Sequence, residues 1–470
     1  MAPMTLPWTM AQAAQAVRGT LVGPGGAMPA AVRVDSRWVE PGEAFVALPG
    51  ARSEGHDFVP QAIQRGASLV VVSERYFSSL FSSCAEAHPG VSWLRVNDTA
   101  EALRELAHAW ARRVAPSHWI AITGSVGKTT TREVLQGALR RHMGVHAAEK
   151  SFNTWIGCAI TVLGMPEHTD AVLLEMGANR QGEIGALVES YPPTMAVITE
   201  VAAAHLEGFG SLEGVLRAKW EITSSSRLRM LSYNEDNDLL RRAVSSSLSP
   251  EIAAVPVGYG VDPFRGVRLE SASLAVRSKL PFLRCRCVVY GRPVELYSRL
   301  FGTQHAHTLG YALGVSHFLG ILPELVALDL EEVPTLRGRG ASDLLDGGML
   351  IDESYNSNPA SLGAALRNLR AIPLEGRRLA VLGGMRELGA SSPQEHGHIL
   401  RETAFLDGLI LVGDEWTSCR GEFPATGRQV PDAPAALELL QALRRPGDII
   451  LVKGSRAYAL ESVVEGLKVS

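Results

Sequence analysis

Apolar residues along the chain gather in short runs, and most of these runs end at a glycine or a polar residue before a stretch with helical spacing. Short apolar runs of this kind are typical of parallel strands that are buried on both faces. Their alternation with helices predicts an α/β chain. The clearest runs cover residues 118–123, 171–174, 195–199, 349–351, 379–382, 409–412 and 449–452.

Two joints divide the chain. An expected helix over residues 100–114 ends before Pro116, and a glycine- and arginine-rich segment follows at 334–340. The length of 470 residues also suggests about three domains. The expected domains cover residues 1–115, 116–334 and 335–470.

The second and third domains have different patterns. Residues 255–297 of the second domain predict short β-strands, and a helix is expected from His305 to about Leu322. In the third domain, each of the four apolar runs ends at glycine or polar residues before a helix. That pattern predicts a doubly wound domain whose active edge lies at the strand ends.

The run at 118–123 leads into two glycines, and helical spacing begins after Lys128. This context suits a phosphate-binding loop, because glycines let backbone N–H groups approach an anion and the helix start adds partial positive charge. Lys128 would lie against the phosphates and the Thr129 hydroxyl would reach Mg²⁺. The alternative is an ordinary strand-to-helix turn with a surface lysine. The expected nucleotide-binding residues here are Gly124, Ser125, Val126, Gly127, Lys128, Thr129 and Thr130.

Two further polar residues stand at or near strand ends, and a third lies on a helix. Glu175 follows the run 171–174 and is a candidate Mg²⁺ ligand, since ligands bind at the carboxyl edge of an open α/β sheet. His205 follows the run 195–199, and Lys219 lies on a helix that begins near Ser211. The alternatives are a capping or surface acid, a structural histidine and a solvated lysine.

The first domain contains a polar and glycine-rich group of residues at 35–37, 42–48 and 55–58, around one expected strand. Ser36 and Arg37, at a turn, are candidates to hold a phosphate or hydroxyl of a ligand. Ordinary turn capping is the alternative for both residues.

Composition narrows the class of protein. The formal net charge of −4 argues against a broad surface for nucleic acid or membrane. No apolar run is long enough to span a bilayer, and residues 1–10 lack the basic start and apolar core of a signal peptide. The five cysteines are scattered and complete no zinc site. A reduced, cytoplasmic protein is expected.

The ordered set of motifs resembles the Mur ligases. The resemblance covers nearly the whole chain, and the set is far more specific than any one motif. The motifs stand at residues 35–37, 55–58, 123–129, 175–178, 205–211 with Lys219, 352–359 and 453–456.

The resemblance implies a small α/β domain for a UDP-linked substrate, a central P-loop ATPase-type parallel sheet and a C-terminal Rossmann-like domain. It implies ATP-dependent amide formation through an acyl phosphate. Within the family, the pattern is most similar to members that add D-alanyl-D-alanine (D-Ala-D-Ala) to UDP-N-acetylmuramoyl (UDP-MurNAc)-tripeptide in peptidoglycan precursor synthesis. The partners are then small molecules, and a monomer is expected.

The resemblance also implies roles for single residues. Lys128, Glu175, His205 and Lys219 would be catalytic, with two Mg²⁺ ions. Thr129 and Glu175 would hold the first ion, and His205 and a carbamylated Lys219 the second. Carbamylation needs a neutral amine, so a lowered pKa is expected for Lys219. Further ATP contacts are implied for Arg339, Asp352, Tyr355 and Asn356. Substrate contacts are implied for Ser36, Arg37, Asn153, Asn358, Lys453 and Ser455.

Several positions depart from the family pattern. Two other hypotheses therefore stay open. One is a Mur-type amide ligase with a different acyl acceptor or amine. The other is a nucleotide-binding module without ligase turnover. The departing positions are Ser151, Thr154, Trp155, Glu200, Ala306, Leu309 and Gly384.

Overall fold

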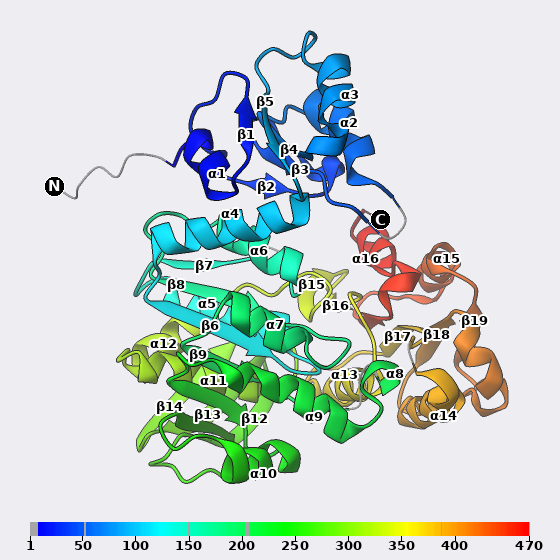
Figure 1. Cartoon of the computed structure of the whole chain (residues 1–470). Helices are drawn as coiled ribbons and strands as arrows, with labels where there is room; N and C mark the ends of the chain where they lie inside the picture. Colours follow the sequence, from blue (N-terminus) through cyan, green and yellow to red (C-terminus); the bar gives the residue numbers. More distant parts are fainter. Residues whose placement is uncertain (1–7, 51–52, 149–150, 203–205, 387, 470) are drawn as a thin grey trace.

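The computed structural model describes residues 8–50, 53–148, 151–202, 206–386 and 388–469. Three β-sheets follow one another along the chain, and helices cover them (Figure 1). Their strands fall within residues 20–96, 118–298 and 341–453. The expected α/β class is confirmed. Within the described ranges, no helix is long and apolar enough to cross a bilayer.

The first sheet has five strands in the order β1-β5-β4-β3-β2, and only β1 pairs antiparallel. Its central strand β4 is apolar and fully buried from Leu69 to Val72. The strands are β1 (Thr20–Val22), β2 (Val32–Arg33), β3 (Ala44–Val46), β4 (Leu69–Ser73) and β5 (Ser92–Val96). The helices are α1 (Met10–Ala16), α2 (Val59–Gln64) and α3 (Glu74–Cys84).

The central sheet has nine strands in the order β14-β13-β12-β11-β10-β9-β6-β8-β7. The part from β7 to β12 is parallel, and β12, β13 and β14 form antiparallel hairpins. The hairpin strands are longer than the short strands expected over 255–297. The strands are β6 (His118–Thr123), β7 (Val145–Ala147), β8 (Ala171–Glu175), β9 (Met195–Ile198), β10 (Met230–Asn234), β11 (Ala253–Gly258), β12 (Val267–Arg277), β13 (Leu280–Val289) and β14 (Arg292–Ser298).

Helices cover both faces of this sheet (Figure 1). One of them, α11, ends at Phe318 instead of continuing to Leu322, because Gly320 adopts a left-handed conformation (φ 81°) that stops the helix. A second helix begins at Pro323. The helices are α4 (Thr99–Val114), α5 (Lys128–Leu139), α6 (Trp155–Leu163), α7 (Glu183–Ser190), α8 (Leu206–Phe209), α9 (Leu212–Trp220), α10 (Asp238–Ser247), α11 (His305–Phe318) and α12 (Pro323–Glu331).

The third sheet has the order β15-β16-β20-β17-β18-β19, with only β15 antiparallel. Helices α13 and α14 pack on one face and α15 and α16 on the other, as expected for a doubly wound domain. The strands are β15 (Ala341–Leu345), β16 (Gly348–Glu353), β17 (Arg378–Gly383), β18 (Gly408–Val412), β19 (Gly427–Val430) and β20 (Ile449–Lys453). The helices are α13 (Pro359–Ala371), α14 (Ser392–Glu402), α15 (Ala433–Leu443) and α16 (Glu461–Val469).

The joint between the second and third sheets is packed. Phe301, between β14 and α11, is fully buried in the core of the third sheet. The Gly338 N–H donates to Asp352 Oδ2 over 2.7 Å, and the Tyr355 N–H donates to the Gly338 carbonyl over 3.1 Å. These contacts fix how segment 335–340 enters the last domain.

Candidate active site

The loop after β6 packs against the end of β9. Gly124 has a φ of 147°, and a Cβ there would lie 2.0 Å from Thr199 Oγ1. That same hydroxyl donates to the Val126 carbonyl over 2.6 Å, and the Ser125 N–H donates to the Glu200 carbonyl over 2.8 Å. The position therefore requires glycine, because any side chain would displace the loop from the strand.

Lys128 begins α5 directly after Gly127, whose φ is 84°. Its ammonium donates to the Gly124 carbonyl over 2.7 Å, so the lysine lies over its own loop. Burial lowers the pKa of Lys128, and the nearby Glu175 carboxylate opposes that shift. Thr129 and Thr130, the next two residues, are buried in the first turn of the helix. Loop, lysine and helix start together form the expected arrangement for holding phosphate.

Glu175 is the last residue of β8 and is 2% exposed. Its Oε2 accepts a hydrogen bond from Thr129 Oγ1 over 3.0 Å, and its Oε1 lies 3.4 Å from the guanidinium of Arg132. Burial raises the pKa of Glu175, while Arg132, Thr129 and Lys128 each counteract part of that rise. The sequence reasoning missed Arg132, although its position one helical turn after Lys128 points it toward the same strand end.

The residues at this point suit a Mg²⁺ ion. Glu175 Oε1 faces the Arg132 guanidinium at 3.4 Å but accepts no hydrogen bond from the described residues. This buried carboxylate oxygen can therefore still bind a cation, beside a helix N-terminus and the Thr129 hydroxyl. Within the described ranges, no group of three or more His, Cys, Asp or Glu side chains that could hold a metal ion is found, here or elsewhere. One carboxylate, one hydroxyl and water are a common Mg²⁺ ligand set in phosphate-transfer sites. His205, the remaining expected ligand, lies outside the described residues.

Lys219, on α9, is 2% exposed, and its ammonium lies 5.3 Å from the centre of the Phe209 ring. Burial, helped by the charge of Lys128, lowers the pKa of Lys219 to about 8; Glu221 and Glu183 act in the opposite direction. The lowered pKa expected from the sequence is therefore confirmed. A buried lysine with an accessible neutral form is the state that reacts with CO₂.

A cavity of about 310 Å³ separates the two lysines. Its walls come from the phosphate loop, the start of α6, the turn after β8 and helices α7 and α9. Asn153 belongs to this wall, and its carbonyl accepts a hydrogen bond from the Gly177 N–H over 2.9 Å. The lining residues are Gly124, Ser125, Lys128, Asn153, Thr154, Trp155, Gly177, Ala178, Asn179, Glu183, Ala186, Leu187, Phe209, Val215 and Lys219.

The third domain reaches this site through Arg339. Its guanidinium donates to Ser151 Oγ over 3.2 Å, and the Ser151 hydroxyl is 2.8 Å from Thr129 Oγ1. Arg339 also lies over the Tyr355 ring, 4.0 Å from its centre. Ser151, at a position where the family usually has another residue, thus links Arg339 to Thr129 in the first turn of α5. Contact of Arg339 and Tyr355 with a nucleotide stays a prediction.

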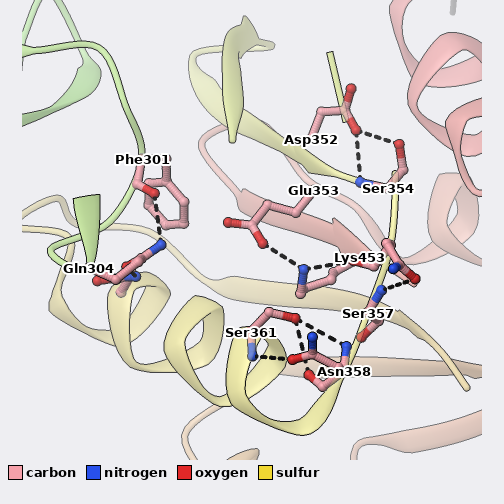
Figure 2. A network of polar contacts seen from close by, with 11 residues as sticks. Phe301, Gln304, Asp352, Glu353, Ser354, Ser357, Asn358, Ser361 and Lys453 are labelled. Carbon is pink, nitrogen blue, oxygen red and sulfur yellow. Dashed lines mark hydrogen bonds and ion pairs between the residues drawn. The ribbon is translucent and has the colours of Figure 1, made fainter. Parts of the chain in front are cut away.

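The segment after β16 is held by buried polar contacts (Figure 2). Asp352 accepts hydrogen bonds from the Ser354 N–H and hydroxyl over 3.1 and 2.6 Å. Lys453 Nζ lies 2.8 Å from Glu353 Oε2 and donates to the Asn356 carbonyl over 3.0 Å. These four side chains shape the loop that contains Tyr355.

Asn358 and Ser455, two expected substrate-binding residues, lie near this segment. Asn358 caps α13, because its side chain accepts from the Ser361 N–H over 2.8 Å and Ser361 Oγ accepts from the Asn358 N–H over 3.1 Å (Figure 2). Ser455 follows β20 and is 6% exposed. Their contact with a substrate stays a prediction.

Ser36 and Arg37 lie in the first domain and do not line the cavity. Ser36 is buried and its hydroxyl donates to Gln61 Oε1 over 2.6 Å. Arg37 is exposed and pairs with Asp35 at 2.6 Å, an interaction that raises the pKa of Arg37. Ser36 therefore joins its turn to helix α2, and Arg37 pairs within the turn. Their role with a UDP group stays a prediction.

Position Glu200 departs from the family pattern, and the structure gives it defined partners. Its carboxylate accepts hydrogen bonds from the side-chain amides of Asn234 (2.8 Å) and Asn237. The neighbouring Thr199 carbonyl accepts from the buried Tyr311 hydroxyl over 2.8 Å. Residue 200 thus ties β9 to β10 and to the cap of α10, beside the phosphate loop.

Family comparisons cover most of the chain. The description "Mur ligase family, catalytic domain" matches residues 30–111, "Mur ligase middle domain" matches 122–263, and "Mur ligase, glutamate ligase domain" matches 342–456. The three matches lie in the three sheet-forming parts, in the order expected from the motifs.

Curated relatives and solved structures match nearly the whole length of this chain. The UDP-N-acetylmuramoyl-tripeptide–D-alanyl-D-alanine ligase of Escherichia coli K12 is 31% identical over 98% of both chains. The enzyme of the same name from Mycobacterium tuberculosis H37Rv is 32% identical, covering 98% of this chain and 97% of that one. A MurF crystal structure from Acinetobacter baumannii has a TM-score of 0.83 and 26% identity over 99% of both chains.

A MurF ligase from Thermotoga maritima, solved in complex with ADP, shares the fold, with a TM-score of 0.76 and 24% identity over 93% of this chain and 97% of that one. Motif order, fold and sequence similarity agree over all three domains. This chain belongs to the Mur ligase family.

Proposed function

We propose that this protein is an ATP-dependent ligase that joins D-Ala-D-Ala to UDP-MurNAc-tripeptide in peptidoglycan precursor synthesis. The observation that carries the proposal is a cavity that is lined by both Lys128 of the phosphate loop and the buried Lys219. Relatives that bear this activity in their names match the chain from end to end.

The reaction has two steps. A carboxylate oxygen of the tripeptide attacks the γ-phosphorus of ATP, the bond to the β-bridging oxygen breaks, and ADP leaves. The amine of D-Ala-D-Ala then attacks the acyl carbon, loses a proton, and inorganic phosphate leaves. Lys128 and the loop N–H groups neutralise and orient the phosphates, which is the main task in phosphoryl transfer. The cavity walls exclude water from the acyl phosphate.

We propose that two Mg²⁺ ions supply further charge neutralisation. Thr129 and Glu175 would hold the first. His205 and Lys219 would hold the second, with Lys219 carrying a carbamate formed from CO₂. The burial of Lys219 supports this, because an uncharged amine is the reactive form and a carbamate would convert a cation into an anionic ligand.

The other contacts are also proposals. Arg339, Asp352, Tyr355 and Asn356 would contact ATP, supported by the position of Arg339 beside Ser151 and Thr129. Ser36, Arg37, Asn153, Asn358, Lys453 and Ser455 would contact the other substrates. We further propose domain limits near residues 115 and 334, a cytoplasmic location and a monomer.

The test is phosphate release from ATP with UDP-MurNAc-tripeptide and D-Ala-D-Ala, omitting each in turn, with mass analysis of the product. We expect release only when both are present, together with a UDP-MurNAc-pentapeptide. The Lys128→Ala variant should lose this release. Phosphate release that does not depend on the dipeptide, or a Lys128→Ala variant as active as the parent, would contradict the proposal.

A second candidate is a ligase of the same family with another acyl acceptor or amine. The observation that favours it is the cavity wall, where the departing residues Thr154 and Trp155 face the same space as Lys128. A panel of UDP-linked peptides and amines, read by the same phosphate assay, separates the two candidates.

A further inference from the structure

A polar cluster stands at the carboxyl edge of the third sheet, outside the cavity described above. The Arg386 Nε lies 2.7 Å from Glu415 Oε1, and its Nη2 donates to the Tyr458 hydroxyl over 3.3 Å. The Tyr458 hydroxyl donates in turn to Glu415 Oε2. The three residues follow three different strands, β17, β18 and β20, so the fold alone brings them together.

Two glycines make room for this cluster. A Cβ at Gly384 would lie 2.5 Å from Glu415 Oε2, and a Cβ at Gly413 would lie 2.2 Å from the Tyr458 hydroxyl oxygen. Gly384 is a position where the chain departs from the family pattern. The Glu415 carboxylate, which follows the neighbouring strand β18, therefore occupies the space that a side chain at position 384 would fill.

The cluster holds a guanidinium with one edge turned outward. Arg386 is 54% exposed and Glu415 only 17%, so the carboxylate lies beneath the arginine. Glu415 and Tyr458 occupy Nε and one side of Nη2. The other N–H groups of Arg386 have no partner among the residues that the structure describes. A guanidinium held in this way presents a planar pair of donors, which matches a carboxylate.

The distance between the end of β20 and the Arg386 cluster is comparable to the length of a dipeptide. Strands β20, β17 and β18 are neighbours, and Lys453, Gly383 and Val412 end them at nearly the same level. Two strand spacings, about 10 Å, separate β20 from β18. An extended dipeptide spans about 7 Å, so its amine can lie at the β20 end while its carboxylate meets the arginine side chain. Ligands of doubly wound sheets bind at this edge, next to the strand where the order reverses.

We propose that Arg386, positioned by Glu415 and Tyr458, binds the C-terminal carboxylate of the amine substrate. The substrate class is a zwitterionic dipeptide that presents its amine toward Lys453 and Ser455. The inference rests on the proposed function, and it assigns this substrate's carboxylate to residues outside every motif used to recognise the family.

The test compares D-Ala-D-Ala with its C-terminal amide in the phosphate-release assay, for wild type, Arg386→Gln and Arg386→Lys. In the wild type we expect a KM for the free acid below that for the amide. Arg386→Gln should raise the KM for the acid about 10- to 100-fold and leave the amide and ATP values unchanged. The KM of Arg386→Lys for the acid should lie between those of wild type and Arg386→Gln, because an ammonium keeps the charge but not the paired donors.

Arg401→Gln is the matched control. Arg401 is also exposed and pairs at 3.4 Å with Glu422, which lies on the same short 3-10 helix (Asp414–Glu422) as Glu415. Its variant should retain the wild-type preference for the acid.

Equal KM values for wild type and Arg386→Gln, or an equal loss for acid and amide, would overturn the inference. A wild type that turns over other amines but not D-Ala-D-Ala would instead overturn the proposed function. The acid and amide of the accepted amine would then test Arg386.

Discussion

Lys219 shows how one buried residue links stability to chemistry. Its folded pKa of about 8 lies below the ordinary 10.5, because the ammonium has lost water and faces Lys128. The unfolded chain therefore binds one more proton between about pH 8 and 10.5, and the free energy of unfolding rises with pH in that window. Below pH 8 the buried lysine is charged and lowers the free energy of unfolding. The proposed catalytic position therefore reduces the stability of the fold.

We expect Lys219→Met to be more stable than wild type at pH 7 by about 1–3 kcal/mol and to have lost turnover. The gain should shrink as pH rises toward 10.5, because the wild-type lysine becomes neutral. Denaturant unfolding of both proteins in bicarbonate-free buffer at pH 7, 9 and 10 measures this difference in the free energy of unfolding. Lys468→Met, at a partly exposed lysine paired with Asp343, is the control and should show no such trend. A gain that does not change with pH would contradict the explanation.

The phosphate loop is the element on which the site is built. Strand β6 and helix α5 were predictable from hydrophobic spacing, and the two glycines between them from the motif. The contact that holds the loop, from Thr199 Oγ1 to the Val126 carbonyl, joins residues that are distant in sequence. No local pattern contains it.

Gly124→Ala should therefore abolish nucleotide binding, because its Cβ would lie 2.0 Å from Thr199 Oγ1. The measurement is the rise in Tm on adding ADP, which should disappear. Gly182→Ala is the control: Gly182 also has a positive φ, 87°, but no atom lies within 4 Å of the added Cβ. That variant should lose about 1–2 kcal/mol of stability and keep the ADP response. An ADP response retained in Gly124→Ala would show that the close contact is not required.

At the scale of the whole molecule, the position of the third domain decides whether the site is complete. Phe301 inserts from the segment after the central sheet into the core of the third sheet. Gly340 packs closely against it, because a Cβ added at Gly340 would lie 3.1 Å from Phe301 Cβ. Arg339, in the same joint, reaches Ser151 beside the phosphate loop. Packing at Phe301 and the polar contact at Arg339 therefore stabilise the same arrangement of domains.

Phe301→Ala should reduce stability by about 3–5 kcal/mol through the cavity it leaves, and should lower kcat more than it raises the KM for ATP. Faster proteolysis in the segment 335–340, together with steady-state kinetics, would reveal the loosened joint. Phe264→Ala, at a phenylalanine that is 74% exposed, is the matched control and should behave as wild type. Unchanged proteolysis and kcat in Phe301→Ala would argue against this role.

The α/β class, the three sheet-forming parts, the phosphate loop and the strand-end acid Glu175 could be predicted from the amino-acid sequence, because they depend on short-range periodicity and on motifs within one segment. The sequence also indicated Lys219, and its lowered pKa is confirmed. The boundaries of β12 and β13 and the end of α11 were less well predicted, since hairpin pairing and a single glycine set them.

The contacts between side chains of distant segments became known from the folded structure. Arg132 beside Glu175, Ser151 between Thr129 and Arg339, Lys453 on Glu353, and Glu415 in the space left by Gly384 all join separate segments. Such contacts depend on strand order and on the crossing of chain segments. Those are properties of the folded chain, and no local spacing of residues encodes them.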